Sequence, residues 1–321
     1  MTVVPIHHIR TQERLPHVSA ASRLGCPSST ERSTWLPPSR SILTQTYHDF
    51  ELIIADNAST DGTAALCRAY AAQDDRIRYV RNARNLGAAP NFNLTLGLAR
   101  GEYFKWAAYD DWIGPAYLAH CVAALDANPD VVLCQTATQA VNAAGVPDTV
   151  LRYHPGVYSS RPEQRFRSIA MIRDNTAVPV FGLIRTGILR RTSCIGSYPS
   201  SDVVLLAELS LYGPFLELDV PLFFWRVHPQ QSTRGVYAVE RNRVAWFDTA
   251  AAARVTLPKW QFFHGYIRAV MRAPLGWGQR LYCYAHIGRW LFMRDHYRAM
   301  VKDLLLAARG RVSARSDIGP P

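Results

Sequence analysis

The chain has 321 residues, of which 48% are hydrophobic and 19% charged, and its formal net charge is +11. This composition can bury a core in one large domain and excludes a fibrous or mainly disordered protein. No run of about 18 apolar residues is present, as a membrane-spanning helix would need, and residues 1–10 lack the apolar stretch of a signal peptide. The six cysteines are scattered without Cys-x-x-Cys pairs, which indicates reduced thiols in the cytoplasm rather than a zinc site or a disulfide framework.

Strands and helices alternate from Phe50 onward. The β-branched run 50–55 predicts a strand that ends in the polar turn 56–62. We then expect strands over 77–81, 103–107 and 131–136, and helices over 64–73, 90–99 and 115–127. This alternation predicts βαβ units and a mainly parallel sheet covered on both faces. Ligands of such sheets bind beyond the carboxyl ends of the strands, so the acidic turns at Asp56 and at Asp110–Asp111 are expected to converge.

Two further regions are predicted after residue 136, a mixed region up to residue 227 and a helical region from Arg234. Residues 137–160 are expected to form a loop or hairpin with its turn at 145–148, and a helix follows over 201–212. Short strands are expected over 215–218 and 222–227, on either side of Pro221. From Arg234 the pattern is helical, in about four segments that break near Pro258, Pro274 and Arg294.

Nearly all the excess positive charge lies in this helical region. Residues 234–321 hold 15 basic and 5 acidic residues, out of 36 and 25 in the whole chain, and aromatic residues are interleaved with them. Such a pattern suits helices lying on an anionic membrane surface. It equally suits a solvated, arginine-rich surface whose aromatic residues face the core, and less well a nucleic-acid-binding surface.

The acidic turns carry the chemistry that can be inferred from residue types alone. Two neighbouring carboxylates, Asp110 and Asp111, opposite a third at Asp56, suit a hard divalent cation that holds a diphosphate. Asp56 can accept hydrogen bonds from a nucleotide's base or ribose. Adjacent aspartates in a turn more often cap a helix, so the order of the motifs is what makes the pattern specific.

Taken together in chain order, the motifs resemble a known family. They are residues 41–47, 50–63, Asn85-Leu86-Gly87, Asn93, residues 99–103 and Tyr109-Asp110-Asp111, with weaker matches over 202–209 and 224–229. This combination is similar to inverting family 2 glycosyltransferases of the GT-A fold. The resemblance implies an α/β, Rossmann-like GT-A domain over residues 41–233, extended by a basic helical region over 234–321.

The resemblance also implies roles for individual residues. Asp202 would be the catalytic base and Asp110 would bind Mg²⁺ or Mn²⁺, with His228 as a further ligand. The donor nucleotide-sugar would be bound by Asp56, Asn57, Asn85, Asp111 and Arg226. Two alternatives stay open, since Asp202 could instead cap its helix and His228 could be a structural histidine. The chain departs from the family at Ala108, which replaces the first acid of its Asp-x-Asp pattern and puts strict metal dependence in doubt.

The N-terminal segment 1–40 is atypical for the family. Residues 23–40 show no strand or helix pattern where the family has its first strand and a Pro-Val-Tyr/Phe-Asn turn. With suitable synonymous codons, a one-base slip over Gly25–Trp35 restores Gly-Leu-Pro-Val-Phe-Asn-Gly. We therefore hypothesise a compensated frameshift, with the loss of the first central strand and weakened activity as its consequence.

The resulting prediction is a glycosyltransferase that moves a sugar from a nucleotide-diphosphate sugar to a hydroxyl of a glycan or glycolipid in cell-envelope or polysaccharide biosynthesis. We expect it in the cytoplasm, at the inner face of the membrane, with an anionic membrane surface as a partner and no nucleic acid. The alternative is a catalytically impaired relic, or a nucleotide-sugar-binding module, of the same fold.

Overall fold

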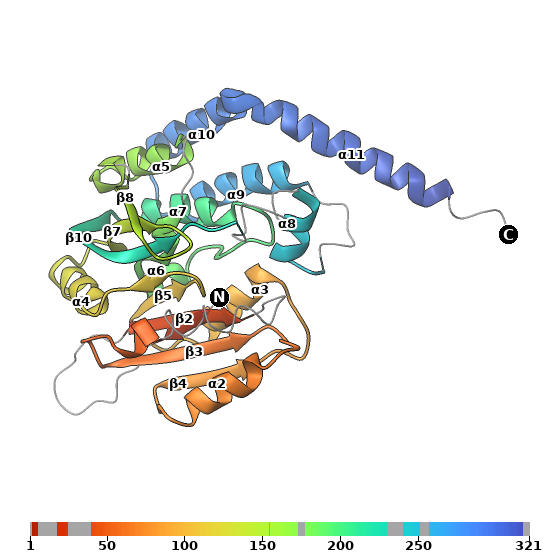
Figure 1. Ribbon diagram of the computed structural model, residues 1–321. Helices are drawn as coiled ribbons and strands as arrows, with labels where there is room; N and C mark the ends of the chain where they lie inside the picture. The colour runs from red at the N-terminus through yellow and green to blue at the C-terminus, as the bar shows by residue number, and fades with distance from the viewer. Residues whose placement is uncertain are drawn as a thin grey trace.

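The protein is described by a computed structural model for residues 2–5, 18–24, 40–153, 155–172, 177–229, 240–250 and 257–316. Its centre is a mixed sheet with the strand order β4-β3-β2-β1-β5-β9-β7-β10-β6, to which β8 is added beside β7 (Figure 1). The strands are β1 Thr2–Pro5, β2 Val18–Leu24, β3 Phe50–Asp56, β4 Ile77–Arg81, β5 Tyr103–Ala107, β6 Trp112–Ile113, β7 Leu133–Val141, β8 Pro147–Leu151, β9 Leu183–Arg185 and β10 Phe215–Arg226. The α/β fold class expected from the sequence is thereby confirmed.

Helices pack on both faces of this sheet, and a helical region follows the last strand at the C-terminus. They are α2 Thr63–Ala71, α3 Ala88–Leu98, α4 Tyr117–Ala127, α5 Pro162–Ala170, α6 Thr186–Leu189, α7 Ser201–Tyr212, α8 Glu240–Phe247, α9 Pro258–Arg272, α10 Trp277–Phe292 and α11 His296–Ser316. The four helices from Glu240 onward break where the prolines and Arg294 predicted. Helices α5 and α6 and the short strand β9 were not predicted.

Alternation along the central strands decides which face each helix covers. Phe50, Leu52 and Ile54 of β3 pack in one buried cluster with residues of α2 and α4. Phe104 and Trp106 of β5 point to the opposite face, where they join a second cluster with α3, α5, α7, α9 and α10. Both clusters are built from runs that alternate with a period of two, because successive side chains of a strand point to opposite faces. The sheet is therefore buried on both sides, as a βαβ fold requires.

Strand β2 corrects one expectation from the sequence. It runs parallel to both β3 and β5, with Ser22 opposite Ile54 and Ala21 opposite Trp106. The expectation that the N-terminal part of the chain supplies no central strand is therefore wrong, because β2 completes the ladder between β3 and β5. The segment 25–39, which contains most of the proposed frame slip, lies outside the described residues, as does the expected domain boundary near residue 233.

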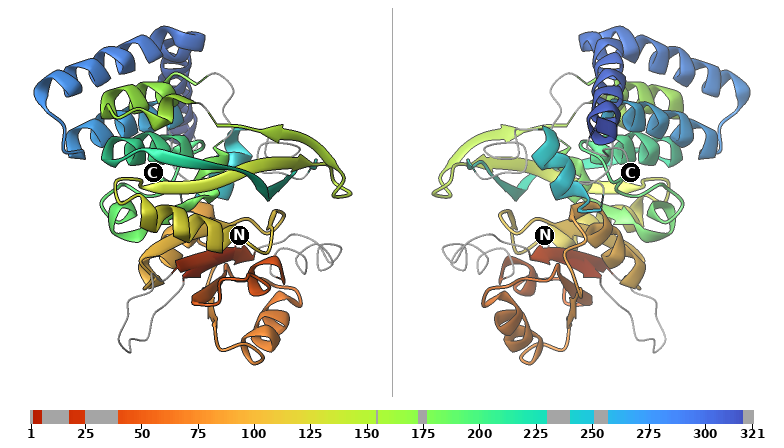
Figure 2. Two further views of the ribbon diagram at one scale, coloured as in Figure 1. Left: turned by 90° about the vertical axis from the view of Figure 1, so that its left-hand side faces the viewer. Right: turned by 90° about the vertical axis from the view of Figure 1, so that its right-hand side faces the viewer.

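The strand β10 differs from the two short strands that the sequence suggested. It is continuous from Phe215 to Arg226 and runs parallel to β7, with an irregular register on both sides of Pro221. Proline lacks the N–H that a regular ladder needs, so the register shifts there without ending the strand. Strands β7, β8 and β10 form a long arm that extends from the body in the side views (Figure 2). The hairpin turn from β7 to β8 is held by the Asn142 side chain, which accepts hydrogen bonds from the N–H groups of Ala144 and Val146.

Candidate functional site

The sheet register places the two acidic turns at the same edge. Asp56, the last residue of β3, lies opposite Leu24 of β2. Ala21 of β2 lies opposite Trp106 of β5. The chain therefore continues from β5 toward Asp110 at about the same height in the sheet as Asp56. In the sheet order β2 and β1 lie between β3 and β5, and β2 also pairs directly with β5. The expectation that these acids lie at one edge, beyond the carboxyl ends of parallel strands, is confirmed.

The Asp56 carboxylate is fully buried and holds the turn that follows β3. Its Oδ1 accepts hydrogen bonds from the Ser59 N–H at 2.8 Å and from the Ser59 hydroxyl at 2.6 Å. Its Oδ2 accepts one from the Tyr79 hydroxyl at 2.7 Å and lies 3.2 Å from Nε of Arg81. Burial raises the pKa of Tyr79 well above its usual value, and the Asp56 carboxylate raises it further. In this conformation the solvent-facing group beside Asp56 is Arg81, whose side chain is 43% exposed.

Asn57 fastens the loop after β4 to the turn after β3. Its amide donates to Oδ1 of Asn85 at 2.7 Å and to the carbonyl of Gly87 at 3.1 Å. Its Oδ1 accepts from the Asn82 side chain and from the Leu86 N–H. Two donors and two acceptor positions are all that a carboxamide offers, so this buried side chain has no capacity left for a ligand. Asn57 positions the exposed Asn85. The sequence analysis assigned both residues to the donor and did not distinguish a positioning residue from an exposed one.

Strand β10 brings two further residues to the acids after β5. The short strand β6 pairs with Phe223 and Phe224 of β10, which aligns the end of β10 with the turn 110–111. The His228 Nε2 then lies 2.9 Å from Oδ2 of Asp110. The Asp111 Oδ1 accepts a hydrogen bond from the backbone N–H of Arg226 at 2.9 Å. These contacts join residues 118 and 115 positions apart, as the weaker sequence match over 224–229 had suggested.

The two neighbouring aspartates have different environments. Asp111 is buried, and desolvation followed by the charge of Asp110 raises its pKa. The side chains of Asp110 and His228 keep 17% and 11% of their surface exposed. Solvent therefore reaches the Asp110–His228 pair, whereas Asp111 anchors the turn to β10.

This pair has the chemistry and spacing to hold a divalent cation. An octahedral cation with ligand distances near 2.1 Å places adjacent ligand atoms about 3 Å apart, which matches the 2.9 Å between Oδ2 and Nε2. Within the described parts of the chain, no group of three or more acidic, histidine or cysteine side chains gathers as a metal site. A cation here would therefore take its remaining ligands from water and phosphate oxygens, which is the usual arrangement for Mg²⁺.

Sequence reasoning missed a buried lysine beneath the same edge. Lys105 lies in β5, and its ammonium donates to the carbonyl of Phe181 and faces the rings of Tyr117 and Phe223 at 4.7 and 4.9 Å. Burial lowers its pKa to about 7, and the neighbouring Cys121 and, less strongly, Asp111 oppose that shift. A charged residue within the otherwise apolar strand 103–107 was the signal that could have revealed it.

Asp202 lies in the first turn of α7, apart from the acid pairs. Its Oδ1 accepts the Val203 N–H at 2.9 Å, and the helix begins at Ser200 without a side-chain cap. Burial raises the pKa of Asp202 from 3.8 to about 6, while hydrogen bonds from the backbone N–H groups of Val203 and Asp202 oppose that shift. The Asp202 charge contributes to the raised pKa values of Tyr153 and Tyr198, which burial mainly causes. No hydrogen bond or ion pair within the described residues joins Asp202 to the Asp110–His228 pair.

Glu208, six positions further along α7, has a structural environment. It is fully buried, accepts hydrogen bonds from the N–H and hydroxyl of Ser193 at 2.9 and 2.6 Å, and forms an ion pair with Arg272 of α9. This carboxylate ties α7 to the preceding loop and to the C-terminal helices.

Comparison with known proteins assigns part of the chain to a family. The sequence profile described as "Glycosyl transferase family 2" matches residues 39–191, which span strands β3 to β9 and the acidic turns. This part of the chain belongs to glycosyl transferase family 2. The resemblance found in the sequence is thus confirmed for the segment that contains Asp56 and Asp110.

Curated glycosyltransferases are similar to this chain over stretches of 70 to 214 residues. The putative glycosyltransferase EpsE of Bacillus subtilis is 41% identical over 87 residues, which are 27% of this chain and 31% of that protein. An uncharacterized glycosyltransferase of Haemophilus influenzae is 26% identical over 214 residues, which are 64% of each chain. Glycosyltransferase GlyG of Streptococcus pneumoniae is 39% identical over 70 residues, covering 22% of this chain and 23% of that one. The matches thus span less than two-thirds of these relatives.

Solved structures extend the fold comparison to most of the chain. S. aureus TarS 1–349 in complex with UDP-GlcNAc matches with a TM-score of 0.59 at 16% identity, covering 88% of this chain and 78% of that one. The same TarS fragment in a second crystal structure matches with a TM-score of 0.59 over 91% and 82%. At this identity the likeness shows a common fold alone.

Proposed function

We propose that this protein is an inverting glycosyltransferase that moves a sugar from a nucleotide-diphosphate donor to a hydroxyl of a glycan or glycolipid acceptor. The family match over residues 39–191 supports the transfer chemistry. The observation that carries the proposal is the Asp110–His228 pair, 2.9 Å apart and open to solvent, at the edge where Asp56 also ends its strand. The fold neighbour TarS was crystallised with UDP-GlcNAc, which makes a uridine diphosphate sugar the first donor to examine.

The donor's diphosphate is assigned to the Asp110–His228 edge. Asp110 and His228 would hold Mg²⁺ or Mn²⁺, which supplies positive charge to the leaving diphosphate. Arg226, whose backbone N–H is bound by Asp111 and whose guanidinium lies 5.1 Å from the centre of the Trp112 ring, would add a second positive charge on turning toward the diphosphate. The nucleotide is assigned to the neighbouring turn, where Asn85 is exposed and Arg81 covers Asp56. Contact between the base and Asp56 requires the Arg81 side chain to move aside.

Asp202 is the proposed general base. Inversion requires a carboxylate that takes the proton of the acceptor hydroxyl while that hydroxyl attacks the anomeric carbon opposite the leaving diphosphate. A pKa of about 6 leaves Asp202 ionised at neutral pH and makes it a stronger base than an ordinary aspartate. Two backbone N–H groups occupy only part of the four lone-pair positions of this carboxylate, so others remain for the incoming proton.

The acceptor is proposed to belong to the cell envelope, with the enzyme working in the cytoplasm at the inner face of the membrane. The five cysteines that the structure describes are free thiols, as expected of a reducing compartment. The cell-envelope assignment rests on the basic, aromatic-rich C-terminal helices, which suit an anionic membrane surface.

Donor hydrolysis tests the proposal with purified full-length protein. Release of the nucleoside diphosphate from a panel of nucleotide sugars is measured with Mn²⁺ and with chelator. We expect one donor to be hydrolysed, and Asp110→Ala to slow that reaction by about 100-fold. Asp219→Ala is the matched control, because Asp219 is 87% exposed on the arm of β10. Equal rates for Asp110→Ala and the control would reject the assignment, and absence of turnover with every donor would favour the non-catalytic relic.

A further inference from the structure

The helix α10 is apolar on two opposite faces. Cys283, Ile287 and Trp290 are buried against the rest of the protein. Trp277, Leu281 and Phe292 are 80%, 66% and 75% exposed. At 100° per residue these three lie within an arc of about 60°, opposite the buried residues. Gly288 lies on that arc and Ala285 about 20° beyond its edge, so small residues fill the exposed apolar stripe between Leu281 and Phe292.

Helix α11 continues this stripe. Tyr297, Val301, Leu304 and Leu305 follow the i, i+4, i+7, i+8 spacing of one helix face, and each is at least 38% exposed. The rings of Phe292 and Tyr297 lie 5.8 Å apart, which joins the two helices at their corner. We call these seven residues the apolar ridge: Trp277, Leu281, Phe292, Tyr297, Val301, Leu304 and Leu305.

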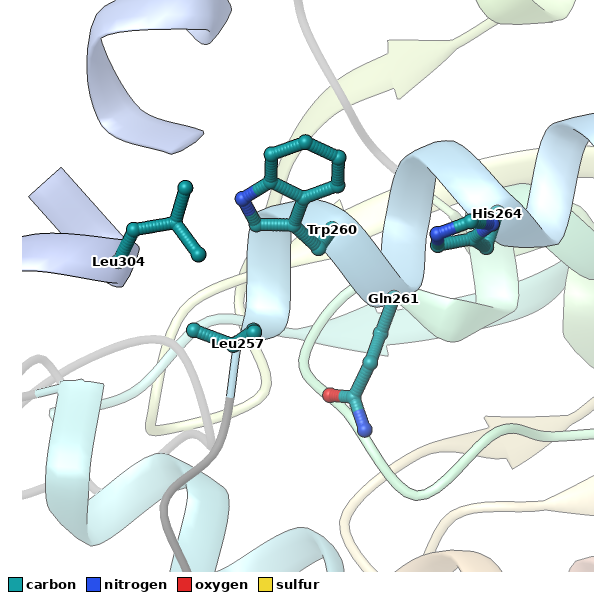
Figure 3. Close-up of a pocket in the computed structure, with 5 residues that line it drawn as sticks. All are labelled: Leu257, Trp260, Gln261, His264 and Leu304. Atoms are coloured by element: carbon teal, nitrogen blue, oxygen red, sulfur yellow. The ribbon is translucent and has the colours of Figure 1, made fainter. Parts of the chain in front are cut away.

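Contacts with α9 fix the orientation of the ridge. The Trp260 indole donates to the carbonyl of Met300 at 3.1 Å, and the Lys259 N–H donates to Asp303 at 2.9 Å. A pocket of about 430 Å³ lies beside this junction, lined by Leu257, Trp260, Gln261, His264 and Leu304, and so by none of the candidate site residues (Figure 3). Figure 1 shows α10 and α11 as the layer farthest from β3 and β4, with α11 projecting away from the body. Leu304 therefore borders α9 at one edge of the ridge, while the other six ridge residues face solvent.

Basic side chains border the ridge on both helices. The Arg280 guanidinium lies 5.9 Å from the centre of the Trp277 ring, and Arg289 is exposed beside the stripe. On α11 the exposed Arg298 and Lys302 follow the same edge. Asp303 is turned inward to Lys259, and Asp295 pairs with Arg298 at 3.3 Å. An apolar stripe between arginines and lysines is complementary to a surface with an apolar interior and anionic groups at its boundary.

Within the described residues, no helix combines the length and the hydrophobicity needed to cross a bilayer.

We propose that the apolar ridge is a docking surface for an anionic lipid bilayer, with α10 and α11 lying along it. The exposed aromatic and leucine side chains enter the boundary between headgroups and acyl chains, and the bordering basic side chains contact anionic headgroups. A second copy of this chain is the competing occupant, since Ala285 and Gly288 would allow another helix to approach closely. The charge asymmetry favours the membrane, because two copies would bring like-charged borders together.

Co-sedimentation of the full-length protein with vesicles tests this inference without any turnover, so it stands or falls independently of the proposed reaction. The vesicles are phosphatidylcholine alone or phosphatidylcholine mixed with phosphatidylglycerol. We expect binding to the anionic vesicles that weakens as salt rises, and little binding to the neutral ones. The triple variant Trp277→Gln, Leu281→Gln, Phe292→Gln is expected to bind at least about 100-fold more weakly.

A matched control keeps the experiment specific. Val146→Gln with Val150→Gln removes exposed apolar side chains from the β7–β8 hairpin and should leave binding unchanged. Arg289→Gln with Lys302→Gln should weaken binding to anionic vesicles by roughly 5-fold per charge. Equal binding to both lipids, or an unaffected triple variant, would overturn the proposal. So would a dimer in light scattering that the triple variant dissociates, in the absence of vesicle binding.

Discussion

The substitution Asp202→Asn should raise the stability of the folded protein and lower its rate of sugar transfer. Asparagine keeps the shape of the side chain and the oxygen that accepts the Val203 N–H, but it cannot ionise. Burial raises the pKa of Asp202 from 3.8 to about 6, so ionisation of Asp202 destabilises the folded protein relative to the unfolded chain. Two pKa units correspond to about 3 kcal/mol, and residual solvent contact reduces the expected gain to about 1–2 kcal/mol.

The pH dependence of this gain follows from the direction of the shift. Below pH 3.8 Asp202 is protonated in both the folded and the unfolded chain, so the variant and the wild type should be equally stable. Between pH 3.8 and 6 the folded state binds the proton more tightly than the unfolded state, and wild-type stability falls as the pH rises. Above pH 6 the difference should be constant, with the variant the more stable protein.

Thermal unfolding across this pH range measures the effect, and donor turnover in the presence of acceptor measures the loss of the base. We expect a melting temperature that is a few degrees higher at pH 8, about 2–4 °C per kcal/mol, and turnover reduced by about 100-fold or more. A variant less stable than the wild type at pH 8 would refute the burial argument. Wild-type turnover with an altered stability would refute the catalytic role alone.

Two further substitutions test the surroundings of the site. Asn57→Ala should lower the free energy of unfolding by about 2–3 kcal/mol in chemical denaturation, because the Leu86 N–H and the Gly87 carbonyl lose the hydrogen bonds that the Asn57 side chain makes to them. A decrease below about 0.5 kcal/mol would show that the loop keeps its conformation without Asn57. Lys105→Met should stabilise the protein by about 1–2 kcal/mol below pH 7, since the lowered pKa of this lysine reflects an unfavourable buried charge. That gain should shrink from pH 7 toward 10.5, and denaturation curves with no pH dependence would contradict it.

The local pattern of the chain was sufficient to predict much of the framework. Strands 77–81 and 103–107 and helix 201–212 have the predicted boundaries, because their apolar periodicity and flanking turn residues are local signals. The N-terminal strand β2 was not recognised, since a short run of alanine and serine carries little β-propensity and its place depends on β3 and β5. Helix α5 was also missed, although its buried Phe166 and Ile169 follow helical spacing.

The candidate site was likewise predicted only in part from the sequence. Motif order predicted that Asp56 and Asp110 share an edge, and parallel pairing around β2 brings this about. Motif order could not predict that Asn57 is saturated by hydrogen bonds or that Asp111 is buried beneath Arg226. Those outcomes depend on which groups lie within 3 Å after packing, and sequence position does not encode that distance.

The sequence by itself determined the alternation of strands and helices, the family of residues 39–191 and the basic character of the C-terminal region, because these depend on composition and on neighbours along the chain. Tertiary structure decided the chemistry. The pairing of β10 with β6 and β7 set His228 against Asp110, burial gave Asp202 its raised pKa, and the corner of α10 and α11 joined two apolar stripes. Each of these depends on desolvation and on contacts between distant segments, which exist only once the chain has folded.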